Sequence, residues 1–183
     1  MDLLPIFAAG TGFMETENLK KEIERLWTEA FGEEKEVTDL FLEQFYNRGR
    51  MLYKECDGRL LSMLHIVPFT LQGQKTGYIY AVATDVTERG KGLATSLMHK
   101  AVERAREMGL NALVLIPADD GLRAFYSRLG FVGDAKVAFD TPHGFDFGTG
   151  DSDNDRLCWL PLNDDFKVAP PCDGTAILLT YTG

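Results

Sequence analysis

The amino-acid sequence predicts a mixed α/β fold of the α+β type, in which helices flank a mostly antiparallel central sheet. Three observations support this. Two amphipathic helical patterns come first, hairpin-type strand patterns follow, and helices then alternate with short strands. The chain has 183 residues, of which 45% are hydrophobic. A chain of this length can bury one core without disulfides or metals, so we expect a single domain over residues 1–183.

Two helices are predicted near the start of the chain, after a short strand at Ile6–Ala9. The first has apolar residues at helical spacing from Leu19 to Ala30, and Gly32 stands where a C-terminal cap belongs. The second spans Val37–Phe45 and closes near Asn47–Gly49.

The pattern then changes to that of strands. Met51–Cys56 and Leu60–Leu71 are predicted strands, and Asp57-Gly58 between them is a strong hairpin signal. Gln72-Gly73-Gln74 forms a second turn into a strand at Tyr78–Thr84. Together these segments predict three antiparallel strands.

The second half begins with the strongest helical pattern of the chain, Gly92–Met108, which ends at Gly109. Ala112–Ile116 is a continuous apolar run, as expected of a buried parallel strand. The remaining predicted elements are a helix at Asp120–Leu129, extended structure at Phe131–Phe139 and a last strand at Ala176–Tyr181.

Composition and charge argue against several function classes. The net charge of −9 disfavours nucleic-acid binding, which depends on Lys and Arg meeting phosphates. Three widely spaced cysteines, with no Cys-x-x-Cys pair, predict reduced thiols and a cytoplasmic location. The three histidines lack metal-ligand spacing, so we expect no metal. The longest charge-free stretch, Leu60–Gln74, is too short and too polar to span a bilayer, so no membrane partner is expected.

A glycine-rich turn joins a predicted strand to the strongest helix. The first N–H groups of a helix have no internal partner and lie at the positive end of its dipole, so they can bind a pyrophosphate. Gly90 and Gly92 would let the backbone approach the anion closely, and Arg89 and Lys91 add positive charge. The alternative is a helix start that happens to carry glycines. The phosphate loop of P-loop NTPases is absent, and Thr95 stands where a dinucleotide fingerprint needs its third glycine.

Two motifs stand in a fixed order here, separated by one predicted helix and one predicted strand. They are Arg89-Gly90-Lys91-Gly92-Leu93-Ala94 and Ala124-Phe125-Tyr126-Ser127-Arg128-Leu129-Gly130-Phe131. They resemble the Gln/Arg-x-x-Gly-x-Gly/Ala motif and the Phe/Leu-Tyr-x-x-Leu-Gly-Phe segment of the GCN5-related N-acetyltransferases (GNAT). The close match covers about Tyr78–Val132. The element order extends it more weakly over residues 1–50 and hardly at all over 140–175. The resemblance implies the acyl-CoA N-acyltransferase fold of that family.

The resemblance also implies acetyl-CoA as the co-substrate. By position, Val82, Ala83 and Thr84 correspond to the strand whose backbone binds the pantetheine arm in the family. The segment that corresponds to the pyrophosphate site consists of Arg89, Gly90, Lys91, Gly92, Leu93, Ala94 and Thr95. These are main-chain roles, so the identity of each side chain matters chiefly through its size.

Tyr126 corresponds to the frequent general acid of the family. The departing CoA thiolate needs a proton, and a phenol with an ordinary pKa near 10 is a suitable donor to it. The alternative is a tyrosine on the apolar stripe of its helix, with the hydroxyl at the edge of the core.

The sequence departs from the family pattern at two places. Asp119 stands where members often carry an Asn that contacts the cofactor, and it could instead cap the helix that starts near Asp120. The strand Leu113–Ile116 has no Glu to serve as general base, so the base is unassigned. Asp85 and His65 are the remaining candidates.

The resemblance implies that the acceptor lies opposite the cofactor, between residues 31–46 and a variable acceptor-side segment at 140–175. Carboxylates beside aromatic faces suit a cationic amine. The alternative is a solvated acidic loop. The residues concerned are Asp140, Asp146, Asp151, Asp153, Asp155, Asp164, Asp165, Phe145, Phe147 and Trp159.

The predicted function is therefore an N-acetyltransferase that moves an acetyl group from acetyl-CoA to a primary amine, on a small molecule or a peptide, by direct attack in a ternary complex. A catalytically degenerate member that binds acyl-CoA as a sensor or regulatory subunit is the alternative. The sequence leaves open whether the chain forms a homodimer.

Overall fold

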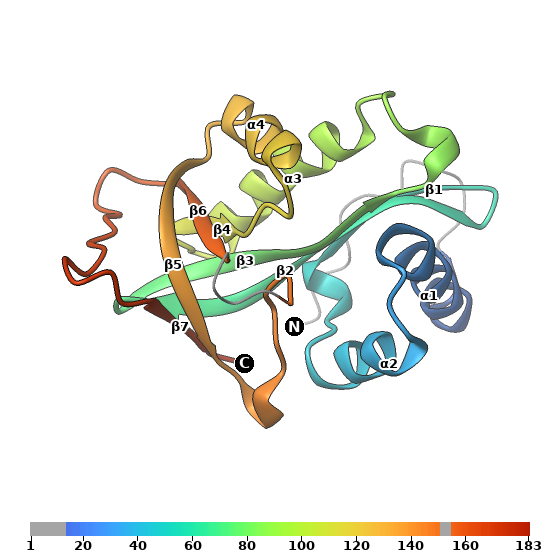
Figure 1. Cartoon of the computed structure of the whole chain (residues 1–183). Helices are drawn as coiled ribbons and strands as arrows, with labels where there is room; N and C mark the ends of the chain where they lie inside the picture. The colour runs from blue at the N-terminus through green and yellow to red at the C-terminus, as the bar shows by residue number, and fades with distance from the viewer. Residues whose placement is uncertain (1–13, 151–154) are drawn as a thin grey trace. The chain divides into compact units, whose positions relative to one another are not determined.

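The computed structural model describes residues 14–150 and 155–183, and the strand predicted at Ile6–Ala9 lies outside them. The order of the described elements follows the prediction apart from one additional strand (Figure 1). The helices are α1 (Thr16–Phe31), α2 (Lys35–Gln44), α3 (Leu93–Glu107) and α4 (Asp120–Arg128). The strands are β1 (Met51–Cys56), β2 (Arg59–Leu71), β3 (Gln74–Thr84), β4 (Ala112–Leu115), β5 (Val132–Asp140), β6 (Arg156–Pro161) and β7 (Ile177–Tyr181).

The strands form a seven-stranded mixed sheet in the order β1-β2-β3-β4-β6-β5-β7, with a further pairing between β2 and β7. The pairs β1–β2, β2–β7, β4–β6 and β5–β6 are antiparallel, whereas β3–β4 and β5–β7 are parallel. The predicted sheet, mixed and mostly antiparallel, is therefore confirmed. Among the helices described here, none is long and apolar enough to cross a membrane.

The chain divides into two compact units. Of the described residues, unit 1 comprises 14–65 and 81–101, and unit 2 comprises 66–80, 102–150 and 155–183. Unit 1 therefore holds α1, α2 and β1, together with the beginning of β2, the end of β3 and the first part of α3. Unit 2 holds α4 and the strands β4 to β7, with the remaining parts of β2, β3 and α3.

The turns of unit 1 follow the sequence signals closely. Asp57 and Gly58 have φ values of 50° and 77°, and positive φ at both central residues is what a type I′ hairpin turn requires. Helix α1 ends at Gly32, whose φ is 66° and whose N–H donates to the carbonyl of Thr28.

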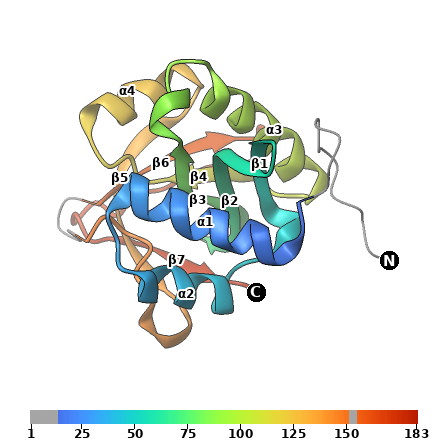
Figure 2. The ribbon, with the colours of Figure 1, turned by 90° about the vertical axis from the view of Figure 1, so that its right-hand side faces the viewer.

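Unit 1 has an aromatic core formed by residues of α1, α2 and β2; Figure 2 shows the course of α1 and α2. The ring centroid of Trp27 lies 5.1 Å from that of Phe41, and Phe41 lies 4.9 Å from His65. All three side chains are buried. Burying a side chain such as Phe41 contributes about 1.5–3 kcal/mol to folding, so these rings fix the two helices on the strand.

Unit 2 has a second aromatic core, and it corrects one expectation. The rings of Phe69, Tyr78, Phe139 and Phe147 lie within 5.3–5.9 Å of one another, mostly edge to face. Phe145 packs on Phe147 at 4.7 Å, and both are buried. The prediction that Phe145 and Phe147 offer their faces to an amine is therefore wrong, because the apolar core of unit 2 takes up both rings.

The additional strand, β6, lies in the segment 140–175, where the sequence analysis predicted no strand. It pairs antiparallel with both β4 and β5, with Val114 opposite Trp159 and Ala135 opposite Leu157. Its apolar run, Leu157–Leu160, resembles the buried run of β4. The surrounding Asp, Gly and Pro residues interrupt the apolar pattern on both sides of this run, so the sequence did not predict the strand.

Strand β3 begins at Gln74, four residues earlier than predicted, and pairs in parallel with β4 over Thr76–Tyr78. A Cβ at Gly77 would lie 2.7 Å from Cγ2 of Ile66, so glycine is needed for this close packing. Further along β3, Ala81 has a φ of 51°. A left-handed conformation is unusual for a residue other than glycine inside a strand.

Candidate functional site

The glycine-rich turn runs into the N-terminus of α3, which begins at Leu93. The carbonyl of Gly92 accepts the first helical hydrogen bond from the N–H of Ser96, at 2.9 Å. The N–H groups of residues 93–95 therefore precede the first residue that bonds within the helix. Such groups bind anions at helix N-termini, and the helix dipole favours negative charge there.

Both glycines of the turn have left-handed backbone conformations. The φ of Gly90 is 76° and that of Gly92 is 78°, and a side chain at either position would be strained. A Cβ built on either residue meets no other atom of the chain within 4 Å. The glycines are thus required by the backbone conformation, and their close approach to a ligand stays a prediction.

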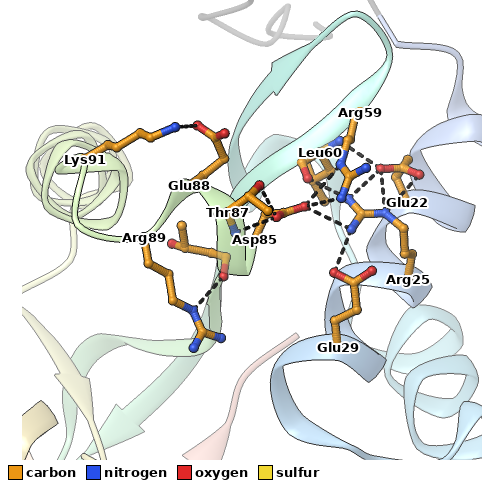
Figure 3. A network of polar contacts seen from close by, with 11 residues as sticks. Glu22, Arg25, Glu29, Arg59, Leu60, Asp85, Thr87, Glu88, Arg89 and Lys91 are labelled. Atoms are coloured by element: carbon orange, nitrogen blue, oxygen red, sulfur yellow. Dashed lines mark hydrogen bonds and ion pairs between the residues drawn. The ribbon is translucent and has the colours of Figure 1, made fainter.

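The two positive charges of the turn have partners within unit 1. The ammonium of Lys91 lies 3.0 Å from a carboxylate oxygen of Glu88. The Nε of Arg89 donates to the carbonyl of Thr84, at 3.2 Å. Lys91 therefore brings less net charge to the turn than its sequence suggests, and Arg89 turns back onto the end of β3 (Figure 3).

The end of β3, which holds Val82, Ala83 and Thr84, contacts a side chain that the sequence did not single out. The hydroxyl of Ser62, on β2, donates to the carbonyl of Ala83 at 3.0 Å and lies 2.9 Å from the hydroxyl of Thr84. A carbonyl oxygen keeps a second lone pair after one such bond. Ser62 thus fixes this backbone without using up its capacity to bind an amide-bearing ligand.

Asp85 follows directly, and its side chain is completely buried. One oxygen, Oδ2, accepts hydrogen bonds from Arg59 at 2.7 and 3.1 Å and from Arg25 at 3.3 Å. The other, Oδ1, accepts from the N–H and the hydroxyl of Thr87 at 3.0 and 2.8 Å. Hydrogen bonds from Arg59, and then from Thr87, hold the pKa of Asp85 well below its usual range.

Helix α1 binds the neighbouring strand through its polar face (Figure 3). Arg25 donates to the carbonyl of Leu60 at 2.7 Å, and Glu22 accepts from the N–H of Leu60 at 2.9 Å. Arg25 also pairs with Glu22 and Glu29 along the helix. The spacing of these charges was visible in the sequence, but it predicts only exposed pairs within a helix. Nothing in the pattern identifies Leu60 or Asp85 as partners.

A cavity of about 380 Å³ lies in unit 1 beside the end of β3. A ligand in it would touch both the strand end and the start of the glycine-rich turn. Its lining residues are Leu26, Glu29, Ala30, Arg59, Thr84, Asp85, Val86, Thr87 and Arg89.

Tyr126, the predicted general acid, belongs to unit 2, whereas residues 82–84 and 89–95 belong to unit 1. It is buried on α4, with its ring 5.1 Å from Phe125 and 5.7 Å from Phe131. Burial raises the pKa of Tyr126 to about 12. The phenol therefore keeps its proton throughout the neutral range, and its catalytic role stays a prediction.

Asp119 caps helix α4, as the alternative reading of this position predicted. Its carboxylate accepts from the N–H of Leu122 at 2.7 Å. The carboxylate thus has a structural use, and a contact between Asp119 and CoA stays a prediction. Leu122 itself is 39% exposed.

Neither candidate base has the surroundings of a base. Asp85 is held as a carboxylate by its hydrogen bonds, so it has little tendency to accept a proton. His65 is buried, and burial lowers its pKa to about 3. Neither ring nitrogen of His65 has a hydrogen-bond partner in the described part of the chain. The general base is still unassigned.

The acidic segment divides into residues with different roles. Asp151 and Asp153 lie outside the described residues. Asp155 is buried and accepts from the N–H and the hydroxyl of Thr149, at 3.0 and 2.6 Å. Asp146 accepts from the N–H of Gly148 at 2.8 Å. Asp155 and Asp146 thus stabilise turns of their own segment. Over residues 14–150 and 155–183, no group of three or more His, Cys, Asp and Glu side chains could hold a metal ion.

A family model described as an acetyltransferase (GNAT) domain matches residues 15–132, which is more than half of the chain. The chain therefore belongs to the GNAT family of N-acetyltransferases, as its two motifs indicated.

Two curated relatives match shorter stretches. The probable glucosamine 6-phosphate N-acetyltransferase 2 of Oryza sativa is 36% identical over 64 residues, which are 35% of this chain and 38% of that protein. The uncharacterized N-acetyltransferase YhbS of Escherichia coli K12 is 30% identical over 105 residues, which are 56% of this chain and 60% of that protein. The matches thus span less than two thirds of either relative.

Solved structures confirm the predicted fold. The YhbS structure from Escherichia coli, a complex with CoA, has a TM-score of 0.61 at 21% identity and covers 89% of this chain and 84% of that one. A GNAT acetyltransferase from Staphylococcus aureus has a TM-score of 0.61 at 16% identity, with 82% and 98% covered.

Proposed function

We propose that this chain transfers an acetyl group from acetyl-CoA to a primary amine, by direct attack of the amine nitrogen in a ternary complex. The observation that carries the proposal is the turn at residues 84–92. Its backbone is held by internal hydrogen bonds, it contains two left-handed glycines, and it leads into the N-terminus of a long helix. The similar YhbS structure contains CoA, which supports CoA as the ligand of this chain.

Acetyl-CoA would supply the activated thioester. In this proposal, the backbone of Val82–Thr84 binds the pantetheine arm, as an unpaired strand edge binds a peptide-like ligand. The N–H groups of residues 90–95 receive the pyrophosphate. Ser62 and Arg89 support these segments from the side, by holding the carbonyls of Ala83 and Thr84.

The transfer forms a nitrogen–carbon bond and breaks the carbon–sulfur bond of the thioester. We assign Tyr126 to the proton that the departing thiolate takes up, since a phenol with a pKa of about 12 is protonated at working pH. The attacking nitrogen must be neutral, so the acceptor loses its proton to solvent or to a base that is still unassigned.

The proposed acceptor is an amine on a small molecule or a basic peptide. The net charge of −9 favours an approaching cation. Both curated relatives are named N-acetyltransferases, which supports a nitrogen acceptor. The acidic segment supports this less than its sequence suggested, because Asp146 and Asp155 are used within that segment.

A second candidate is a protein that binds an acyl-CoA without turnover. The buried, unpartnered His65 and the ion-paired Asp85 favour it, because neither can act as the general base in the described conformation.

The test combines binding with turnover. Calorimetry with CoA and with acetyl-CoA measures binding, and release of free thiol is followed with a panel of polyamines, amino sugars and basic peptides at pH 7–9. We expect binding of both ligands and amine-dependent thiol release that rises with pH. Binding without release for any amine would favour the sensor. A chain that binds neither ligand would refute both candidates.

A further inference from the structure

We propose that Asp85 is a positioning residue for CoA binding, which holds the glycine-rich turn in its binding conformation by anchoring it to α1 and β2. The inference rests on the proposed function, because it assumes that this turn binds the pyrophosphate. The side chain of Asp85 is completely buried, and both of its carboxylate oxygens are bonded to protein groups.

Every polar group of Asp85 has a partner. Its N–H donates to the carbonyl of Leu61 at 2.8 Å, and its carbonyl accepts from the N–H of Glu88 at 2.9 Å. Oδ1 accepts twice from Thr87, and Oδ2 accepts from Arg59 and from Arg25. A residue bonded on all sides has one conformation available to it, so the chain leaves β3 in a fixed direction.

The two carboxylate oxygens of Asp85 bind different partners and have different effects on the turn. Oδ1 shapes the short 3-10 turn Val86–Glu88, which leads to Arg89 and Gly90. Oδ2 ties that turn to guanidinium groups from two other elements, Arg25 on α1 and Arg59 on β2. The turn therefore takes its position from elements outside the recognisable motif (Figure 3).

One of the two anchors, Arg25, is itself fixed. Arg25 donates to the carbonyl of Leu60 at 2.7 Å, and Glu22, its ion-pair partner, accepts from the N–H of Leu60 at 2.9 Å. Arg59 lies on β2, and Arg25 lies on α1, which is bound to the same stretch of β2. Both arginines thus hold Asp85 from one part of unit 1. A loop held in this way is already ordered before the ligand arrives, so binding costs less conformational entropy.

Substitution of Asp85 by Asn separates the contributions of the two carboxylate oxygens. An Asn side chain can still cap the turn, as Asn47 caps the 3-10 turn Arg48–Arg50 through the N–H of Gly49. It has no charge to hold the two arginines, and one of its polar atoms is a donor. Asp85→Asn therefore removes the anchor and keeps the cap.

The experiment measures CoA affinity by calorimetry, together with kcat and the KM for acetyl-CoA. For Asp85→Asn we expect the Kd for CoA to rise about tenfold and the KM for acetyl-CoA to rise in parallel. The kcat at saturating acetyl-CoA and the KM for the acceptor should stay within about twofold of the parent. Asp39→Asn is the matched control, because Asp39 pairs with Lys35 on the surface of α2, and it should bind CoA as the parent does.

Arg59 provides a second variant in case Asp85→Asn does not fold. Arg59→Gln should weaken CoA binding by at least about threefold, and Arg59→Lys, which keeps the charge, should recover part of the loss. The inference fails if folded Asp85→Asn binds CoA like the parent. If Asp85→Asn does not fold, unchanged binding by Arg59→Gln decides against it. A parent chain that binds no CoA would refute the proposed function as well, so the two failures are distinguished by the parent alone.

Discussion

Replacing His65 with Phe should reduce the loss of folding stability at acid pH. The imidazole of His65 lies among the rings of Trp27, Phe41 and Tyr46, at centroid distances of 6.4, 4.9 and 5.9 Å. It is buried, and neither ring nitrogen has a partner among the described residues. Such a site accepts a neutral ring and resists a charged one. A phenyl ring has a similar shape and carries no polar atoms.

The magnitude follows from proton linkage. In the unfolded chain the pKa of His65 is near 6.5, and burial lowers it to about 3 in the folded chain. Above pH 6.5 the ring is neutral in both states, so it adds no pH dependence. Below pH 6.5 the unfolded state binds a proton that the folded state does not, and stability falls as the pH falls toward 3. At pH 5 the difference of about 1.5 pH units amounts to about 2 kcal/mol.

The assay is thermal unfolding between pH 5 and pH 8. For a chain of this size, about 2 kcal/mol corresponds to roughly 4–8 °C in Tm. His65→Phe should therefore lose that much less Tm than the parent between pH 8 and pH 5. His99→Gln is the control, since His99 is exposed on α3, and it should follow the parent. Parallel Tm curves for His65→Phe and the parent would refute the reasoning, because they would show that His65 takes up its proton in the folded state.

Two further predictions concern the proposed active site. Gly92→Val should weaken CoA binding at least tenfold, about 1.4 kcal/mol, because a branched side chain is strained at a φ of 78° and would face the pyrophosphate. Calorimetry checks this, and a folded variant with parental affinity would place the site elsewhere. Tyr126→Phe should lower kcat about 10²-fold with little change in the KM for acetyl-CoA. An unchanged kcat, when chemistry limits the rate, would indicate that Tyr126 only packs in the core of unit 2.

The elements with local signals could be predicted from the sequence. The turn at Asp57-Gly58, the end of α1 at Gly32 and the continuous apolar run of β4 each depend on a few neighbouring residues. Strand β6 could not be recognised in the same way, because its four apolar residues follow an Asp- and Gly-rich stretch. Its partners β4 and β5 are distant in sequence, so the pairing that defines it leaves no local pattern.

The candidate site divides in the same way. Gly90 and Gly92 indicate a backbone conformation that other residues rarely adopt, and both have positive φ in the structure. Ser62, Arg25 and Arg59 have no such signal, since each acts through a partner at least 21 residues away in the chain. A serine in a strand or an arginine on a polar helix face is ordinary until its partner is known.

The bonding of Asp85 bears on whether the phosphate-binding motif can be transplanted. Residues 89–95 form a compact stretch that would be easy to graft onto another helix. The distant groups that hold Asp85, and with it the start of the turn, come from Leu61, Arg59 and Arg25, which precede Asp85 by 24 residues or more. A graft of the motif alone would carry its glycines and leave its anchors behind. The unit that could be moved between proteins is therefore α1, the β1–β2 hairpin and the turn together.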